Sequence, residues 1–375
     1  MLAVIHRTLR SGPAWLRGLG ILLTGLAFLQ GCAQTQTTEH GPNPQGDSRN
    51  SASQPQSAAY KTYKSALSAQ KREDYEAAAA LYTDVLNLAD RRLYASAHIN
   101  RAYAYKELMR YEDSLQDHNA YLQIKKASGH KPSSRQFYLS RADVLAELGR
   151  YNEARADLKF AQTFVGKSDT KRDAVLGITG DTATVATAIL YDKIGDRSES
   201  LRIINAALKE LSRNHDPTKD GVVYMALYMD LLTRSVLYTH AANYEAALKD
   251  IRNAETAMAF LFTGDPSVKP SNELVRPLMR LSLLLYRAYI LDLSNQRSAA
   301  IATLQDARRT VSKLASISPE EEEEEKLNSE LDLAIQELSA SNGNQHSQAL
   351  HKLFLRNARD LNPSIGFTEQ INLNG

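Results

Sequence analysis

Two stretches of the chain share one pattern of arginine, alanine, tyrosine and aspartate, and this pattern constrains the fold more than any other feature. Residues 100–124 and 140–162 each carry Arg-Ala early, Arg-Tyr in the middle, and then a small residue and an aspartate. Their apolar spacing is typical of two short amphipathic helices joined by a tight turn. A pair this short cannot bury its own apolar stripe and needs similar neighbours. The sequence therefore predicts stacked helical hairpins.

The same pattern can be followed through six segments. They cover about residues 58–89, 94–125, 135–165, 181–210, 222–262 and 273–311. Tyrosines are expected at the first three turns, where Tyr75, Tyr111 and Tyr151 recur at nearly regular intervals. Each segment has one small residue in its first helix and another in its second, which lets the two backbones approach closely. These residues are Ala66, Ala102, Ala142, Ala188, Ser235 and Ala288, then Ala78, Ser114, Ala154, Ser200, Ala247 and Ala300.

This order of aromatic, small and aliphatic positions resembles the tetratricopeptide repeat. The resemblance implies an all-α, right-handed solenoid of helical hairpins, with six repeats over residues 58–311. No repeat carries the tryptophan of the family pattern, because Trp15 is the only tryptophan. In the sixth repeat, we expect Pro277 to mark an irregular helix start.

Two further helices are expected after the repeats, over residues 312–361, followed by an irregular tail over 362–375. Six consecutive glutamates, 320–325, follow Ser318 and Pro319. A calcium or basic-partner patch is one interpretation, but a capped helix start explains the residues better. The buried stripe of this helix would be Leu327, Leu331, Ala334 and Leu338, and that of the facing helix Leu350, Leu353, Phe354 and Ala358. We expect this hairpin to cap the open end of the array.

An arginine and an aspartate recur with one fixed spacing in three repeats. The pairs are Arg101 with Asp117, Arg141 with Asp157, and Arg234 with Asp250. Residues so placed about a hairpin turn face each other, so we predict three ion pairs between the two helices of a hairpin. The first and fourth repeats lack both partners, and Arg287 in the sixth faces Thr303.

The N-terminal residues predict an export signal. Residues 1–17 contain Arg7, Arg10 and Arg17 and no acid, and residues 18–31 form an apolar run that ends at Cys32. As a helix this run would span roughly 21 Å, too short for a hydrocarbon core of ~30 Å. Residues 29–32, Leu-Gln-Gly-Cys, resemble the lipobox of bacterial lipoproteins. The resemblance implies a signal peptide over 1–31 and a lipid attached to Cys32; a non-lipidated signal is the alternative.

Residues 32–57 follow as the lipidated cysteine and a linker without large apolar side chains, which we expect to be disordered. Because Ala33 follows Cys32, the lipoprotein resemblance points to the periplasmic face of an outer membrane. Without residues 1–31 the chain carries 42 basic and 43 acidic residues. This balance gives no concentrated basic footprint for nucleic acid.

No catalytic or metal-binding constellation is recognisable in the sequence. The nine histidines are scattered without ligand spacing, and Gly166-Lys167-Ser168 lacks the first glycine and the strand of a phosphate loop. We therefore expect no catalytic residue, no cofactor and no metal.

The repeat resemblance implies instead a concave groove, lined by first-helix residues, that binds an extended peptide or a partner helix. The family register assigns to it Tyr60, Tyr63, Ile99, Tyr103, Lys106, Leu139, Asp143, Ile189, Met229, Leu232, Leu285 and Tyr289. Tyrosines beside charged residues suit a peptide with apolar anchors.

The sequence thus predicts a lipid-anchored adaptor or assembly scaffold for other envelope proteins. The alternative is a surface lipoprotein that binds a glycan or another small ligand. The identity of the partner and the oligomeric state are left open.

Overall fold

The computed structural model describes residues 58–88, 91–129, 135–164, 182–213, 221–261, 269–317, 321–340 and 345–361. The predicted signal peptide, Cys32, the linker and the tail lie outside these ranges.

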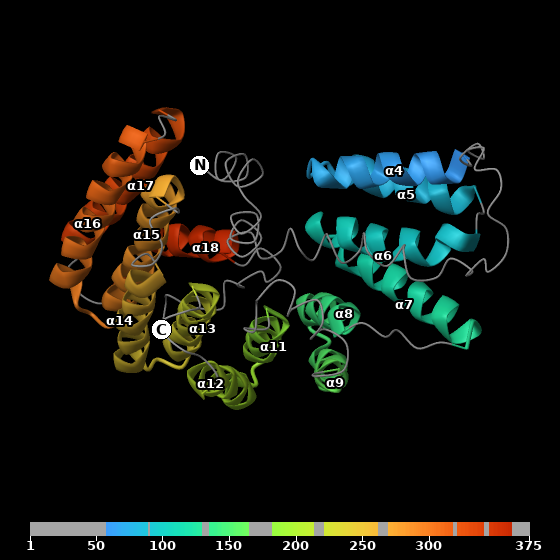
Figure 1. Ribbon diagram of the computed structural model, residues 1–375, viewed down its shortest axis with the longest axis horizontal. Helices are drawn as coiled ribbons and strands as arrows, with labels where there is room; N and C mark the ends of the chain where they lie inside the picture. Colours follow the sequence, from blue (N-terminus) through green and yellow to red (C-terminus); the bar gives the residue numbers. More distant parts are fainter. Residues whose placement is uncertain are drawn as a thin grey trace. The chain divides into compact units, whose positions relative to one another are not determined.

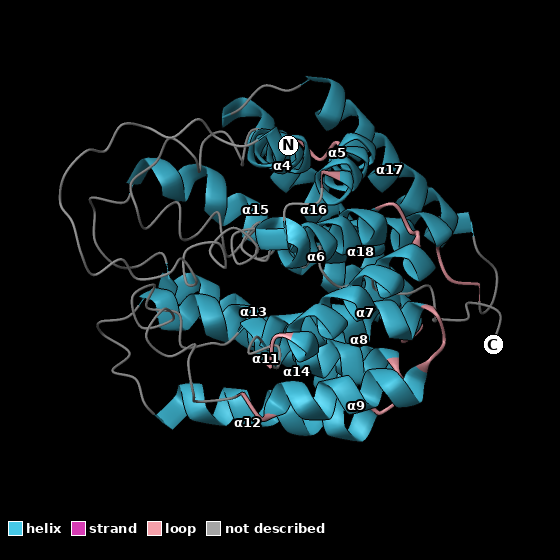
Figure 2. Ribbon diagram, turned by 90° about the vertical axis from the view of Figure 1, so that its right-hand side faces the viewer, coloured by secondary structure: helices cyan, strands magenta, loops and turns pink. Residues whose placement is uncertain are grey.

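The described residues form helices and short connections, with no strand among them (Figures 1 and 2). The predicted fold class, an all-α array of tetratricopeptide-type hairpins, is confirmed. The first helices of the six hairpins are α4 (Ala58–Lys71), α6 (Arg91–Glu107), α8 (Arg135–Glu147), α11 (Thr182–Lys193), α13 (Gly221–His240) and α15 (Lys269–Leu293). Their second helices are α5 (Tyr75–Asn87), α7 (Tyr111–Ala127), α9 (Tyr151–Gln162), α12 (Arg197–Arg213), α14 (Tyr244–Leu261) and α16 (Arg297–Ile317). Two more follow, α17 (Glu321–Ala340) and α18 (Gln348–Leu361).

The helices belong to two compact units, which divide between Val165 and Gly166. One unit contains α4–α9 and the other α11–α18. In each unit the two helices of a hairpin pack together, and each second helix also packs against the next first helix. This alternation gives the helices inside a unit a neighbour on either side, as repeat proteins require.

The two helices of every hairpin meet at the predicted small residues. All twelve of these residues have 0% of their surface exposed. In two hairpins a serine at this contact also forms a hydrogen bond across it. Ser114 Oγ donates to the Ala102 carbonyl at 2.7 Å, and Ser235 Oγ donates to the Ala247 carbonyl at 3.1 Å. Close approach therefore depends on side-chain size, because a larger residue would separate the backbones.

Each hairpin turn contains one residue in the left-handed backbone region, at the same place in all six repeats. Gly149 and Gly195 occupy it in two repeats, with φ of 70° and 82°. The other four turns have residues with a Cβ there, at φ between 54° and 63°: Glu73, Met109, Ala242 and Asn295. Glycine adopts this conformation without the steric cost that a Cβ brings.

The last two helices cover the end of their unit. The predicted stripe of α17 is buried, and Leu350, Leu353 and Phe354 of α18 are buried as well. Helix α17 packs on α16, and α18 packs on both α17 and α15. The Phe354 ring stacks on Tyr289 of α15 with centroids 4.1 Å apart. Helix α18 thus covers a face of α15 in addition to the contacts that α15 makes with α14 and α16.

The expectation for Pro277 was wrong. Helix α15 begins at Lys269 and continues through Pro277. A proline inside a helix removes one backbone hydrogen bond, but the helix of 25 residues is long enough to continue on both sides.

We predict that Met109→Gly stabilises the protein, because it removes the left-handed strain at φ 58°. The relief of strain should contribute about 1 kcal/mol to the free energy of unfolding. The greater freedom of glycine in the unfolded chain offsets part of this gain. Urea denaturation followed by circular dichroism measures it. Gly149→Ala is the matched opposite change, since a Cβ there would meet no atom within 4 Å. It should destabilise through backbone strain alone, and a neutral result for both variants would contradict the explanation.

Candidate partner-binding surface

All three predicted arginine–aspartate ion pairs are present and bidentate. Arg101 Nε and Nη2 donate to the two carboxylate oxygens of Asp117 at 2.7 and 2.8 Å. The corresponding distances are 2.7 and 2.6 Å for Arg141 with Asp157, and 2.7 and 2.7 Å for Arg234 with Asp250. The three aspartate side chains are buried. A bidentate pair of this kind is the strongest geometry for a hydrogen-bonded arginine and carboxylate.

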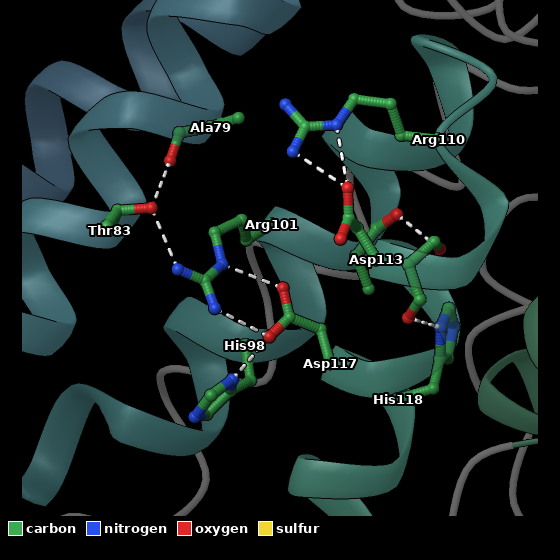
Figure 3. A network of polar contacts seen from close by, with 10 residues as sticks. Ala79, Thr83, His98, Arg101, Arg110, Asp113, Asp117 and His118 are labelled. Atoms are coloured by element: carbon green, nitrogen blue, oxygen red, sulfur yellow. Dashed lines mark hydrogen bonds and ion pairs between the residues drawn. The ribbon is translucent and has the colours of Figure 1, made fainter.

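Each of these arginines also reaches the second helix of the preceding hairpin. Figure 3 shows Arg101 between Asp117 and Thr83, whose Oγ1 accepts from Nη1 at 2.8 Å. Arg141 Nη1 donates to Asn119 at 3.4 Å, and Arg234 Nη1 donates to Asn205 at 2.7 Å. One guanidinium therefore joins three helices and links neighbouring repeats.

The acceptors on the preceding helix were missed in the sequence, although a signal for them exists. Asn119 lies two residues after the aspartate slot at Asp117, and Thr83 and Asn205 occupy the same position in their own helices. Where the arginine is absent, at Thr187, the preceding helix has Lys159 in this position. In the sixth repeat, where Arg287 is exposed, the preceding helix has Arg252 in this position. A cation in this position cannot accept from a guanidinium, so the polar residue and the ion pair occur together.

A histidine completes the environment of Asp117. His98 Nδ1 lies 2.7 Å from Asp117 Oδ1 (Figure 3). Burial alone would raise the pKa of Asp117, but the hydrogen bonds from Arg101 and His98 outweigh it and lower this pKa. The carboxylate stays ionised and braces the hairpin; it is not poised for proton transfer.

A second polar contact joins successive first helices. Lys106 Nζ of α6 lies 3.2 Å from Asp143 of α8. Asp192 of α11 has the same position in its repeat as Lys106 has in the second repeat. Asp192 pairs with His240 of α13. In the last repeat Asp292 takes this position and accepts from the backbone N–H of Ser347 at 2.9 Å. Lys106 and Asp143, both predicted to line the groove, therefore bind each other.

The other predicted groove residues differ widely in exposure. Seven of the twelve are buried: Tyr63, Leu139, Asp143, Ile189, Leu232, Leu285 and Tyr289. Ile99, Tyr103, Lys106 and Met229 are half-buried, and Tyr60 is 37% exposed. Tyr289 stacks under Phe354 and its hydroxyl lies 2.9 Å from His351 Nδ1, so α18 already covers it. The accessible part of the predicted set is concentrated in α4 and α6.

A mixed polar and aromatic cluster surrounds Tyr103 in this accessible part. Tyr75 lies edge-on to Tyr103, with ring centroids 6.0 Å apart, and Lys106 Nζ is 5.8 Å from the Tyr103 centroid. Glu107 Oε1 lies 3.6 Å from Lys106 Nζ. Burial raises the pKa of the Glu107 carboxyl against the opposing effect of Lys106. With Asp143, two carboxylates share one ammonium, and the cluster offers aromatic edges and polar groups together.

Tyr75 and Glu107 were not among the predicted groove residues. Tyr75 was assigned to a hairpin turn, and Glu107 lies one position beyond the last residue taken from the family register in that helix. Only the packing of successive repeats brings the turn of one hairpin beside the first helix of the next.

A separate cavity lies on α7 and the turn between α8 and α9. Its volume is about 310 Å³, and its lining consists of Glu112, Leu115, Gln116, Asn119, Leu148 and Arg150. This is at the lower end of the range for ligand pockets. The lining contains no nucleophile paired with a base, so the cavity can hold a small polar group but has no evident chemistry of its own.

The described ranges contain neither a metal-binding cluster nor a membrane-spanning helix. No group of three or more histidine, cysteine, aspartate or glutamate side chains there could hold a metal ion. Among the helices of those ranges, none combines the length and the apolar character needed to cross a bilayer.

Three solved structures have a similar helical arrangement over most of this chain. A tetratricopeptide repeat protein from Parabacteroides merdae is 18% identical over 84% of this chain and 95% of its own, with a TM-score of 0.45. The apo form of the quorum sensor NprR from B. thuringiensis is 14% identical over 92% and 91%, with a TM-score of 0.47. NprR in complex with its cognate peptide NprX is 13% identical over 90% and 85%, with a TM-score of 0.46. Likenesses this distant do not bear on function.

No protein-family model matches the chain, and no curated protein matches it either.

We predict that Arg101→Met lowers the free energy of unfolding by about 3 kcal/mol, because it leaves the buried Asp117 carboxylate with His98 alone. Arg287→Met is the matched control. This arginine has the same position in its repeat but is exposed and faces Thr303, so its loss should cost less than about 0.5 kcal/mol. Urea denaturation of both variants tests the difference, and equal effects would show that the brace contributes nothing specific.

The stability of the chain should fall as pH decreases from about 6.5 to 4, because of His118. This side chain has 0% exposure, and burial lowers its pKa from 6.5 to about 4. The unfolded chain therefore binds a proton in this range that the folded chain does not, and the loss amounts to about 3 kcal/mol at pH 4.

His118→Leu should remove this contribution, since Leu158 and Leu304 fill the equivalent buried position in other repeats. Denaturation curves of both proteins at a series of pH values measure the effect. An identical pH dependence would mean that folding does not lower the pKa of His118.

Proposed function

We propose that this chain is a lipid-anchored adaptor of the bacterial cell envelope. In this proposal Cys32 carries the lipid on the periplasmic face of an outer membrane. The helical hairpins then hold a peptide segment of another envelope protein. The adaptor acts by raising the local concentration of its partner at the membrane and by orienting it.

One observation supports peptide binding most directly. In the unit of α4–α9, Tyr60, Ile99 and Tyr103 remain accessible on successive first helices, beside the charged cluster around Lys106. Aromatic anchors next to polar groups are the residues that dominate binding energy at protein interfaces. The buried members of the predicted set in this unit, Tyr63, Leu139 and Asp143, do not contact the peptide in this proposal.

The anchor is supported by sequence alone. Three arginines, an apolar run too short to span a bilayer, and Leu29-Gln30-Gly31-Cys32 follow each other in the order of a lipoprotein signal. Stable attachment needs more than one acyl chain, which lipoprotein processing of Cys32 would provide.

Photo-crosslinking in cells tests the peptide surface. A photoreactive amino acid in place of Tyr60 should give a discrete adduct whose partner mass spectrometry identifies. The same substitution at Phe160 is the control, because Tyr60 and Phe160 are both 37% exposed but Phe160 lies on the second helix α9. Adducts of equal yield from both positions would argue against a specific surface on the first helices.

Incorporation of a labelled fatty acid tests the anchor. The natural chain should become labelled, whereas Cys32→Ala should not, because the thiol is the only attachment point of this kind. Label that persists in the variant, or label absent from both, would refute lipidation at Cys32 without affecting the peptide surface.

A glycan-binding role is the second candidate, and one contact favours it. Tyr224 and Phe260, at the ends of α13 and α14, stack with ring centroids 5.3 Å apart and an angle of 18° between them. Phe260 is 53% exposed, and flat aromatic faces of this kind can stack on sugar rings. Recovery of polysaccharide with the natural chain but not with Phe260→Ala, and no protein adduct at Tyr60, would favour this function.

A further inference from the structure

The first helix of the array differs from every other described first helix in one respect. One stripe of α4 consists of Lys61, Lys64, Ser65, Ser68 and Lys71, and it continues into Arg72 after the helix end. All of these residues are exposed. Their spacing places them on one face, opposite the buried Tyr63, Ala66 and Ala69.

In the other repeats the same stripe is an inter-repeat contact. The corresponding residues of α6 are Ala97, Asn100, Arg101 and Ala104. Ala97 and Ala104 are 0% exposed, Asn100 is 1% exposed, and Arg101 reaches back to Thr83. At the equivalent positions, α13 has the buried residues Asp230 and Leu237, and α15 has the buried residues Leu283 and Ile290. The sequence of α4 replaces these buried residues by lysine and serine.

The charge of this face is of one sign. Helix α4 contains no acidic residue, and Lys64 Nζ lies 5.2 Å from the ring centroid of the partly exposed Tyr60. Glu73 and Asp74 lie beyond its end, in the turn, where Asp74 caps α5. The outer residues of α5 are acidic instead, with Glu76 and Asp84 exposed. A face that served only to stay in water would need no such separation of charge.

We propose that the stripe Lys61–Arg72 of α4 is a docking face for an anionic lipid surface. Lysines on one helix face with an aromatic ring at their edge are typical of segments that lie on a membrane. The proposal rests on the membrane attachment proposed above, because Cys32 would hold α4 close to such a surface. The partner is the layer of negatively charged headgroups, which cations attract over about one Debye length.

This contact would orient the array relative to the membrane. The lipid on Cys32 acts through the linker over 33–57, and a flexible linker by itself fixes a distance but no orientation. Contact through the stripe along α4 would define which way the first-helix surface around Tyr103 faces.

Vesicle co-sedimentation tests the proposal. The chain from Ala33 onward, which contains every described residue and no acyl chain, is mixed with vesicles of phosphatidylcholine or of an equal mixture of phosphatidylcholine and phosphatidylglycerol. We expect binding to the mixed vesicles only, weakened by salt. Changing Lys61, Lys64 and Lys71 together to Gln should weaken it about a hundredfold, at about fivefold for each lysine.

The matched control changes Lys126, Lys159 and Lys209 to Gln. These lysines are exposed on α7, α9 and α12, and the net charge changes equally, so binding should stay within about twofold of the natural chain. Equal loss in both variants, binding that ignores phosphatidylglycerol, or equally tight binding to duplex DNA would each overturn the proposal. Because the protein carries no lipid in this experiment, its result is independent of acylation at Cys32.

Discussion

Everything else in the structure depends on the contact between small residues inside each hairpin. All twelve of these alanines and serines are completely buried. Their size sets the distance between the two helices, and that distance sets what longer side chains can reach. Only at this separation can Arg101 hold Asp117 across the hairpin with two hydrogen bonds. A larger side chain at the contact would separate the helices and break the ion pair together with the packing.

The polar contacts between repeats are built on this frame, and they determine which side chains stay accessible to a partner. The braces of Arg101, Arg141 and Arg234 link each hairpin to the one before it. Lys106 with Asp143 and Asp192 with His240 link successive first helices. Among the side chains left accessible are Tyr60, Ile99 and Tyr103 on α4 and α6, and the lysine face of α4. We propose a peptide as the partner of the first surface and anionic lipid as the partner of the second.

Sequence reasoning identified the hairpins, their small contacts and the three ion pairs, because all of these follow from spacing within one repeat. It was less informative about the groove. The family register assigned twelve residues to it, but seven of them are buried. The register gives the direction of a side chain on its own helix and not what lies above it. Tyr289 is the plainest case, since α18 returns from much later in the chain to cover it.

The sequence by itself determined the repeat, because helical periodicity, residue size and the fixed offset between arginine and aspartate are local properties. The tertiary structure decided how repeats use these side chains. It made Lys106 and Asp143 partners instead of two separate ligand contacts, placed Tyr75 and Glu107 beside Tyr103, and left the stripe of α4 uncovered. These outcomes depend on which helix lies next to which. A pattern within one repeat does not contain that information.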